Sequence, residues 1–237
     1  MVTGNNESIS GFNESGVPNA LFATEPEFDI PWLDINLCAD FIDLPLEPWG
    51  AKARTKKHKG TVHFYVQDYR FTGTWKKPNK IIDCGCVTII EPNFSVSLST
   101  PRALVLERIY KKRWLARYWQ EHGIKVVVDM NVPSQFHEYN LLGVPRDWFA
   151  FATHGYNDRI EGLNDEYNSV CHHRGDEDFV WLVYGGGEAV KKYCQDRKWL
   201  WFPEQSDMTR GRIKPDTRSS VYTQTRTREG VQQSVSV

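Results

Sequence analysis

The sequence has no apolar run approaching the roughly 20 residues that a membrane-spanning helix needs. Its start also lacks the basic residues and apolar stretch that direct secretion. These two absences predict a protein that does not span a membrane and that stays in the cytoplasm. The cysteines are few and odd in number: Cys38, Cys84, Cys86, Cys171 and Cys194. In a cytoplasmic protein we expect them to be free thiols.

Positive charge is absent from the first 50 residues, which contain no Lys or Arg. The same segment carries nine acidic residues: Glu7, Glu14, Glu25, Glu27, Asp29, Asp34, Asp40, Asp43 and Glu47. Residues 51–80 reverse the balance, with nine Lys or Arg residues against a single acid, Asp68. Blocks of like charge are typical of interaction arms or solvated faces. We therefore expect the acidic arm to bind a protein partner or to cover the basic segment.

The apolar content excludes disorder of the whole chain. Hydrophobic residues make up 40% and aromatic residues 13% of the 237 residues, which is enough to build a core. Local composition divides the chain into four parts. They are a disordered segment at 1–20, an acidic arm and basic loop packed on the body at 21–60, an α/β domain at 61–205, and a basic disordered tail at 206–237.

Apolar runs typical of buried strands alternate with helical segments in the body of the chain. The strand signals cover residues 61–71, 86–91, 125–129, 148–153, 179–184 and 199–202. The clearest helix runs from Pro101 to Gly123, because Thr100 suits its cap and Gly123 its end. Continuous apolar strands separated by helices predict an α/β fold with a mostly parallel sheet. Both an incomplete barrel and an open doubly wound sheet fit this pattern.

The stretch from Gly85 to Gln205 resembles a family of phage and mobile-element proteins known as a domain of unknown function. The matching segments are Pro92 to Ser95, Tyr110 to Tyr118, Gly123 to Val127, Trp148 to His154, and Tyr184 to Gly186. The resemblance implies a viral or mobile-element origin, and so a location in the host cytoplasm. It supplies no catalytic residues.

Chemically capable residues follow several of the predicted strands. In parallel α/β folds, ligands bind beyond the carboxyl ends of the strands. That rule selects Tyr184 and four candidate catalytic residues, which are Glu91, Asp129, His154 and Glu204. Together they could perform acid–base or metal-assisted chemistry. The alternative is that they are ordinary polar residues at strand ends, in contact with water.

The long helix carries a cluster of basic residues: Arg108, Lys111, Lys112, Arg113 and Arg117. Tyr110, Trp114 and Tyr118 are interleaved with them. Such a surface can neutralise phosphates while its aromatic rings stack on exposed bases. Three lysines of the basic loop, Lys56, Lys57 and Lys59, add to this prediction of nucleic-acid binding. The alternative is a solvated helix face whose aromatic side chains pack inward.

Glycines and cysteines form two further patterns. Gly185, Gly186 and Gly187 stand between a strand and a helix, where backbone amides could bind a phosphate. A tight turn explains them equally well. Cys84 and Cys86 have a one-residue spacing that does not fit a usual zinc site, so we expect them to pack as small apolar side chains. The sequence indicates no metal site, and it leaves the identity of any cofactor unknown.

Three functions therefore remain open. The first is a nucleic-acid-associated protein of phage or mobile-element replication, with single-stranded DNA as the candidate partner. The second is an α/β-class enzyme, a metal-assisted or acid–base hydrolase, with its site at the strand carboxyl ends. The third is a protein–protein interaction module that uses the acidic arm. Whether Glu91, Asp129, His154 and Glu204 point into one pocket is the observation that would best separate them.

Overall fold

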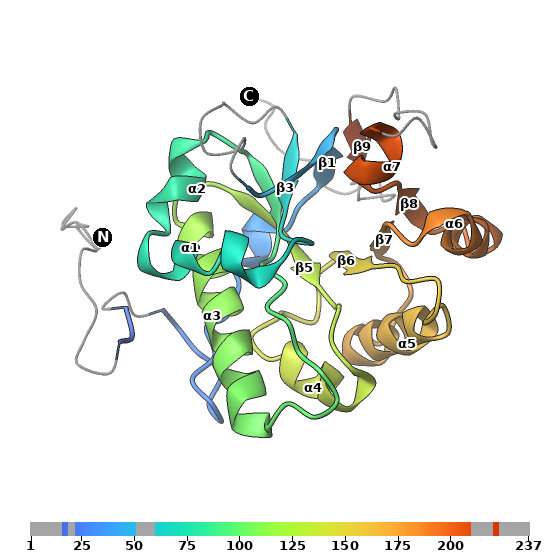
Figure 1. Ribbon diagram of the computed structural model, residues 1–237. Helices are drawn as coiled ribbons and strands as arrows, with labels where there is room; N and C mark the ends of the chain where they lie inside the picture. The colour runs from blue at the N-terminus through green and yellow to red at the C-terminus, as the bar shows by residue number, and fades with distance from the viewer. Residues whose placement is uncertain (1–15, 19–21, 51–59, 210–219, 223–237) are drawn as a thin grey trace, which may run out of the picture.

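A seven-stranded parallel sheet forms the centre of the computed structural model, which describes residues 16–18, 22–50, 60–209 and 220–222 (Figure 1). Its strands are β2 (Leu46–Pro48), β3 (Thr61–His63), β4 (Thr88–Ile90), β5 (Lys125–Asp129), β6 (Ala150–His154), β7 (Val180–Tyr184) and β8 (Leu200–Phe202). They lie side by side in the order in which they occur in the chain. A sequential order means that the sheet is wound in one direction only. The doubly wound alternative is thereby excluded.

Helices connect the strands. They are α1 (Gly73–Lys76), α2 (Asn79–Asp83), α3 (Arg102–Gln120), α4 (His137–Asn140), α5 (Gly162–Arg174), α6 (Gly187–Asp196) and α7 (Gln205–Thr209), with single 3₁₀ turns at Ile35–Leu37, Asp68–Arg70 and Ser134–Phe136. A separate antiparallel pair joins β1 (Phe41–Asp43) to β9 (Ser220–Tyr222). The alternation of parallel strands and helices confirms the predicted fold class. Among the described residues, no helix has both the length and the apolarity to span a membrane.

The sheet is strongly curled. The ring of His63 on β3 lies 4.2 Å from that of Tyr184 on β7, centroid to centroid. Four strand spacings separate β3 from β7, so a flat sheet would place these residues about 19 Å apart. The sheet therefore bends into a half-barrel, which corresponds to the incomplete-barrel alternative. Its concave face carries His63, His154 and Tyr184 together.

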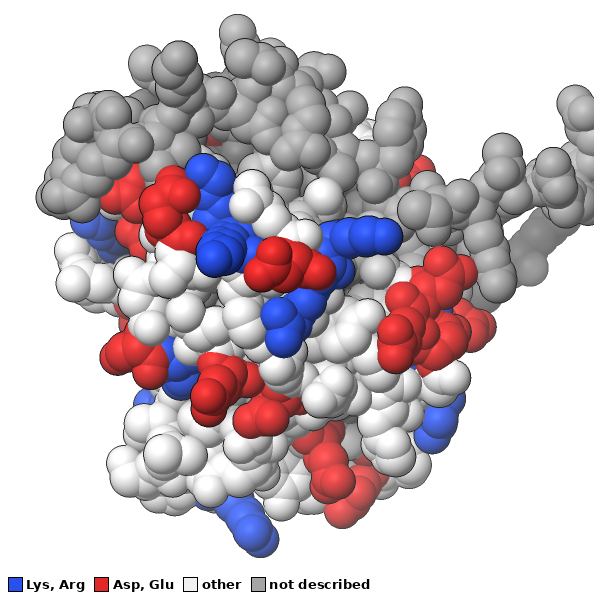
Figure 2. Space-filling model, turned by 90° about the vertical axis from the view of Figure 1, so that its right-hand side faces the viewer, with Lys and Arg blue, Asp and Glu red and all other residues white. Residues whose placement is uncertain are grey.

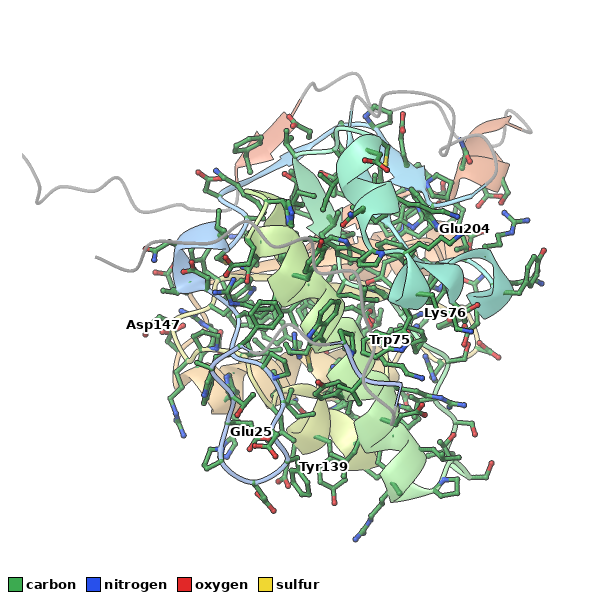
Figure 3. The ribbon with its side chains drawn as sticks, turned by 90° about the vertical axis from the view of Figure 1, so that its left-hand side faces the viewer. Glu25, Trp75, Lys76, Tyr139, Asp147 and Glu204 are labelled. Carbon is green, nitrogen blue, oxygen red and sulfur yellow. The ribbon has the colours of Figure 1, made fainter. Side chains whose placement is uncertain are left out.

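The core lies between the sheet and α3. Val126, Val127 and Val128 of β5 are fully buried, as their continuous apolar run predicts. Helix α3 follows Pro101 and ends shortly before Gly123, whose φ of +78° is a conformation that glycine adopts easily. Its Trp119 stacks on Phe64, with ring centroids 5.7 Å apart. On the outer side, Trp75 of α1 packs on α3 (Figure 3).

Two boundaries differ from the sequence prediction. The sheet begins at Leu46, within the segment predicted as an arm, because Leu46 pairs with Thr61 in a parallel register. The strand predicted at 61–71 ends at His63, since the chain turns sharply where the amide of Val66 donates to the carbonyl of Phe64. Lys56, Lys57 and Lys59 lie outside the described residues, as do most of segment 1–20 and most of the predicted tail.

Candidate active site at the carboxyl ends of the strands

The four candidate catalytic residues lie on one rim of the half-barrel. Glu91 follows β4, Asp129 ends β5, His154 ends β6, and Glu204 follows β8. The structure joins them in two pairs. Glu91 Oε2 accepts a hydrogen bond from the Asp129 amide at 3.2 Å, and His154 Nε2 lies 3.6 Å from Glu204 Oε1. The prediction of a shared rim is therefore met, but a single four-residue constellation does not form.

The first pair is tied to α3 by buried ion pairs. Arg113 Nη1 contacts Glu91 Oε1, and Lys112 Nζ lies 3.1 Å from Asp129 Oδ2. The four side chains are between 0 and 3% exposed. Burial raises the pKa of Glu91, and the charges of Arg113 and Lys112 oppose that rise. Arg113 also donates to the backbone carbonyls of Asn140 and Leu142, so the group holds α3, α4 and the strand ends together.

This placement corrects the predicted basic surface of α3. Lys112 and Arg113 face the sheet, because the buried carboxylates of Asp129 and Glu91 require cationic partners. The ammonium group of Lys112 and the guanidinium group of Arg113 are therefore buried and cannot contact a phosphate at the surface. Three of the five cations remain partly exposed: Arg108, Lys111 and Arg117.

Two of these three cations, Lys111 and Arg117, have both acidic and aromatic neighbours, whereas Arg108 donates to the carbonyl oxygen of Ser95. Lys111 pairs with Glu107 and Arg117 with Glu121, each one helical turn away. Lys111 also lies over the ring of Trp75, and Arg117 over that of Phe22. On a different face of the molecule, the side of α5 and α6 that Figure 2 shows, basic and acidic side chains are interspersed among the described residues. Nucleic-acid binding by these residues stays a prediction.

A cluster of rings occupies the concave face near the rim. The rings of Tyr65 and Tyr184 stack 5.7 Å apart, and that of His154 lies 4.4 Å from that of Tyr156. Burial lowers the pKa of His63 to about 3 and that of His154 to about 4, so both imidazoles are neutral at pH 7. Two buried ring nitrogens, His63 Nε2 and His154 Nδ1, have no hydrogen-bond partner within the described part of the chain.

The neutral state determines which nitrogen of His63 carries the proton. His63 Nδ1 accepts a hydrogen bond from the Tyr65 amide at 3.2 Å. The hydrogen of the neutral ring must therefore be on Nε2. His63 thus presents a donor to the concave face.

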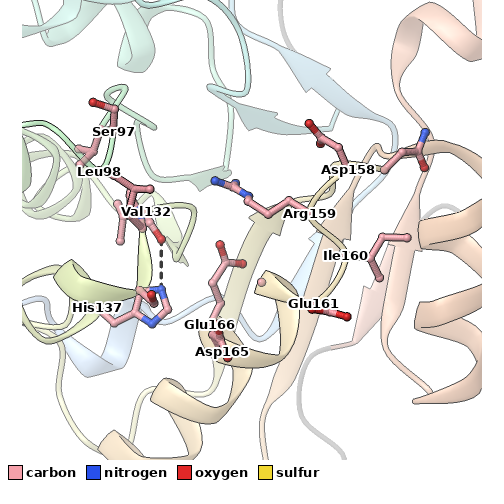
Figure 4. Close-up of a pocket in the computed structure, with 15 residues that line it drawn as sticks. Ser97, Leu98, Val132, His137, Asp158, Arg159, Ile160, Glu161, Asp165 and Glu166 are labelled. Carbon is pink, nitrogen blue, oxygen red and sulfur yellow. Dashed lines mark hydrogen bonds between the residues drawn. The ribbon is translucent and has the colours of Figure 1, made fainter.

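A cleft of about 880 Å³ opens beside this cluster, between the loops that follow β4, β5 and β6 (Figure 4). Its lining includes Ser97, Val132, His137, Arg159, Asp165 and Glu166. A smaller hollow of about 230 Å³ adjoins it, shares Arg159 with it, and adds Asn131 and Tyr156. Active sites of barrel folds lie at this end of the strands. Glu91, Asp129, His154 and Glu204 do not line the cleft.

Glu166 is the unusual residue of the cleft. Its side chain comes from α5 and is 4% exposed, and its buried Oε2 has no hydrogen-bond partner among the described residues. Burial raises its pKa from 4.5 to about 8, although the nearby hydroxyl group of Thr153 and the charge of Arg159 act in the opposite direction. In Figure 4 the Glu166 carboxyl group and the Arg159 side chain point toward the same space. A carboxyl group with a pKa near neutrality is typical of catalytic acids and bases.

Arg159 is held in place by two neighbours. Its Nη2 donates to Asn131 Oδ1 at 3.0 Å, and its guanidinium lies 4.7 Å from the centroid of the Tyr156 ring. Asn131 is itself fixed, because its backbone N–H donates to Asp129 Oδ1 at 3.2 Å and its side-chain Nδ2 donates to the Tyr156 hydroxyl at 3.4 Å. The buried Asp129 pair therefore supports the wall of the cleft from behind.

Sequence reasoning missed the residues that line this cleft. Arg159 and Tyr156 lie in the loop directly after a predicted strand, so the strand-end rule could have selected them. Nothing comparable marks Glu166, which stands in a polar helix among Asn164, Asp165 and Tyr167. Only its position in the fold, where its side chain is buried, distinguishes it from these more exposed neighbours.

The three glycines after β7 all have positive φ angles, between +67° and +83°. A Cβ atom on Gly185 would lie 2.8 Å from Glu204 Oε1, and one on Gly186 would lie 2.5 Å from Val190 Cγ2. Backbone conformation and close packing thus explain Gly185 and Gly186. Phosphate binding at Gly185, Gly186 and Gly187 stays a prediction, and the carboxylate of Glu204 beside Gly185 disfavours an anion there.

Within the described ranges, no three His, Cys, Asp or Glu side chains converge closely enough to hold a metal ion.

The chain belongs to a family described as a domain of unknown function, DUF4417, whose match covers residues 22–168. This confirms the resemblance. The Gene 1 protein of Mycobacterium phage L5 is 31% identical over 113 residues, which are 45% of this chain and 47% of that protein. The Gene 1 protein of Mycobacterium phage D29 is 34% identical over 70 residues, 29% of this chain and 26% of that protein. The chain thus spans less than half the length of these relatives, and no solved structure matches it.

Proposed function

We propose that the chain is an enzyme that performs acid–base chemistry on a small polar substrate in the cleft at the carboxyl ends of β4, β5 and β6. The observation that carries the proposal is Glu166, a buried carboxyl group with a raised pKa of about 8 and an unpartnered oxygen, in the wall of a cleft of about 880 Å³. A buried group without a partner costs stability, and such groups gather at functional sites.

The assigned roles follow from the chemistry of the lining. At pH 7 the carboxyl group of Glu166 is mostly protonated, so it can donate a proton to the leaving oxygen of a substrate. Arg159 and Asn131 offer hydrogen bonds to substrate oxygen atoms, and the Tyr156 ring, 38% exposed, offers a flat surface for contact. The reaction class is that of an acid–base hydrolase, with Glu166 as the acid in place of the four strand-end residues.

Nucleic-acid binding is the second proposal. It is supported by Arg108, Lys111 and Arg117 on the outer side of α3, two of which lie against aromatic rings. Fewer cations are available for phosphate contacts than the sequence suggested, because Lys112 and Arg113 are buried.

Titration of Glu166 tests the first proposal directly. Carbon-13 NMR of labelled Glu side chains should show one carboxyl group that titrates near pH 8 and disappears in Glu166→Gln. The matched control is Glu161→Gln, an exposed carboxylate of the same cleft. A Glu166 resonance that titrates near 4.5 would remove the basis of the proposal.

A measurement of catalytic activity is the second test of this proposal. A panel of chromogenic esters, phosphodiesters and glycosides should yield at least one substrate whose turnover falls about 100-fold or more in Glu166→Gln, as expected for loss of a general acid. Glu161→Gln should retain it. Turnover that is equal in both variants would assign the activity to another group.

A further inference from the structure

Cys84 and Cys86 lie at the opposite end of the sheet from the cleft, in the turn that leads from α2 to β4. Cys84 is the residue directly after α2, and Cys86 comes two residues before Thr88 starts β4. Gly85 between them has a φ of +71° and an open space where a Cβ would stand. This left-handed turn reverses the chain, so that both sulfur atoms face the end of α2.

The two thiols share one hydrogen-bond acceptor. Cys84 Sγ lies 3.0 Å from the carbonyl oxygen of Ile81, and Cys86 Sγ lies 3.6 Å from the same oxygen. Cys84 Sγ also lies 3.2 Å from the carbonyl oxygen of Lys80. Both sulfur atoms thus gather around the last turn of α2. The two sulfur atoms are therefore neighbours, and a bond between them requires only that the side chains rotate until the sulfur atoms stand about 2 Å apart.

The environment distinguishes this pair from the other cysteines. When Cys84 ionises, a hydrogen bond from the Cys86 thiol, in place of the one to Ile81, lowers the pKa of Cys84 and correspondingly raises that of Cys86. Burial raises the pKa of Cys38 and of Cys194 to about 12, and it also raises that of Cys171. Since the thiolate is the reactive form, Cys84 should be the most nucleophilic of the five cysteines.

The turn is accessible to a small reagent only. Gly85 is exposed and Val87 is 51% exposed, whereas Cys84 and Cys86 are 6% and 5% exposed. A small oxidant can reach sulfur atoms at this depth more easily than a bulky disulfide such as glutathione disulfide.

We propose that Cys84 and Cys86 are a modification site, at which hydrogen peroxide converts the two thiols to an intramolecular disulfide. The thiolate of Cys84 attacks peroxide, so that an S–O bond forms, the O–O bond breaks, and the released hydroxide takes up a proton to become water. The Cys86 sulfur then attacks the sulfenic sulfur, an S–S bond forms, and a second water leaves with the Cys86 proton. Both sulfur atoms are oxidised, peroxide is reduced, and a dithiol reductant reverses the change.

Mass spectrometry of the full chain tests the proposal. After exposure to peroxide and trypsin digestion without reductant, the peptide Ile81–Arg102 should lose two hydrogen atoms, and dithiothreitol should restore them. The loss should occur about tenfold faster than oxidation of Cys38 or Cys194, whose thiols are not ionised at neutral pH. A peptide that keeps both thiols while Cys171 is oxidised would overturn the proposal.

Variants separate the two steps. In Cys86→Ser, the reaction should stop at the sulfenic acid of Cys84, which dimedone traps, whereas Cys84→Ser should trap little. Cys171→Ser is the matched control and should behave as the unaltered chain. Persistent dimedone labelling of Cys84 in the unaltered chain would show that Cys86 does not resolve the sulfenic acid, and would also overturn the proposal.

A second probe needs no variant. Arsenite is a small reagent that bridges two thiols only where they lie close together, so the reduced, unaltered chain should bind it and should then resist peroxide at Ile81–Arg102. Failure to bind would contradict the shared position of the two sulfur atoms, whatever the fate of the serine variants.

Discussion

At the ends of β4 and β5, buried Glu91 and Asp129 each have a cationic partner from α3. On neighbouring α5, buried Glu166 has an oxygen with no hydrogen-bond partner in the described part of the chain. The two regions use the same side-chain type at similar depth. Paired carboxylates connect helices to strands and contribute to the architecture, whereas the unpaired carboxyl group keeps its proton and faces a cleft. The presence or absence of a partner thus separates the structural acids from the candidate catalytic acid.

The largest effect should come from breaking the paired region. Arg113→Met leaves the Glu91 carboxylate buried without its partner, which should lower the free energy of unfolding by about 3–5 kcal/mol. Urea unfolding measures the change. The double variant Glu91→Met with Arg113→Met should recover much of the loss, because no buried charge is then left without a partner. Arg117→Met, at the surface of the same helix, should cost less than about 1 kcal/mol. If Arg113→Met and Arg117→Met lowered the free energy of unfolding equally, the buried ion pair would not have the structural role assigned to it.

The next effect should appear in the dependence of stability on pH. The folded-state pKa of Glu166, about 8, lies above the ordinary value of 4.5, so the folded chain keeps a proton that the unfolded chain releases. Stability from this group is full below pH 4.5 and is lost as the pH rises through 8. The slope between these values should be about 1.4 kcal/mol per pH unit. Glu166→Gln should remove that slope, and Glu161→Gln should leave it, in urea unfolding at several pH values.

For His154 on the concave face, the dependence of stability on pH should have the opposite sign to that of Glu166. The pKa of His154 is lowered to about 4 from 6.5, so the unfolded chain binds a proton before the folded chain does. Stability from this group is full above pH 6.5 and is lost as the pH falls through 4. His154→Gln should reduce the acid-side slope by about 1.4 kcal/mol per pH unit. His172→Gln, whose side chain is exposed, should not change it. An unaltered slope in His154→Gln would mean that this ring is solvated.

The smallest expected effect concerns the surface of α3. If Arg108, Lys111 and Arg117 contact phosphates, their joint replacement by Gln should weaken binding to single-stranded DNA and reduce its salt slope by about 2. Fluorescence anisotropy at several salt concentrations measures both. Replacement of Lys191 and Lys192 on α6 is the control and should have little influence. If the unaltered chain did not bind single-stranded DNA at low salt, the proposal of nucleic-acid binding would fail and the enzyme proposal would remain.

Much of the fold could be predicted from local patterns. Apolar runs located all or part of β3 to β8, and Pro101 and Gly123 bounded α3 closely, because burial and helix ends leave a signature in neighbouring residues. Strand β2 was missed because its three residues follow prolines and acids that resemble a loop. The strand-end rule placed Glu91, Asp129, His154 and Glu204 on one rim correctly. It could not show that the first two would be neutralised by Lys112 and Arg113.

The sequence by itself determined that parallel strands alternate with helices and that polar residues collect at their carboxyl ends, because both follow from the period of apolar residues along the chain. Only the tertiary structure decided that the sheet curls until His63 meets Tyr184, since curvature depends on how all the strands and helices pack. Tertiary structure also decided which charges are buried with partners. Glu166 and Asp165 are adjacent in the chain, yet one is buried and the other exposed, because α5 turns one toward β6 and the other toward solvent.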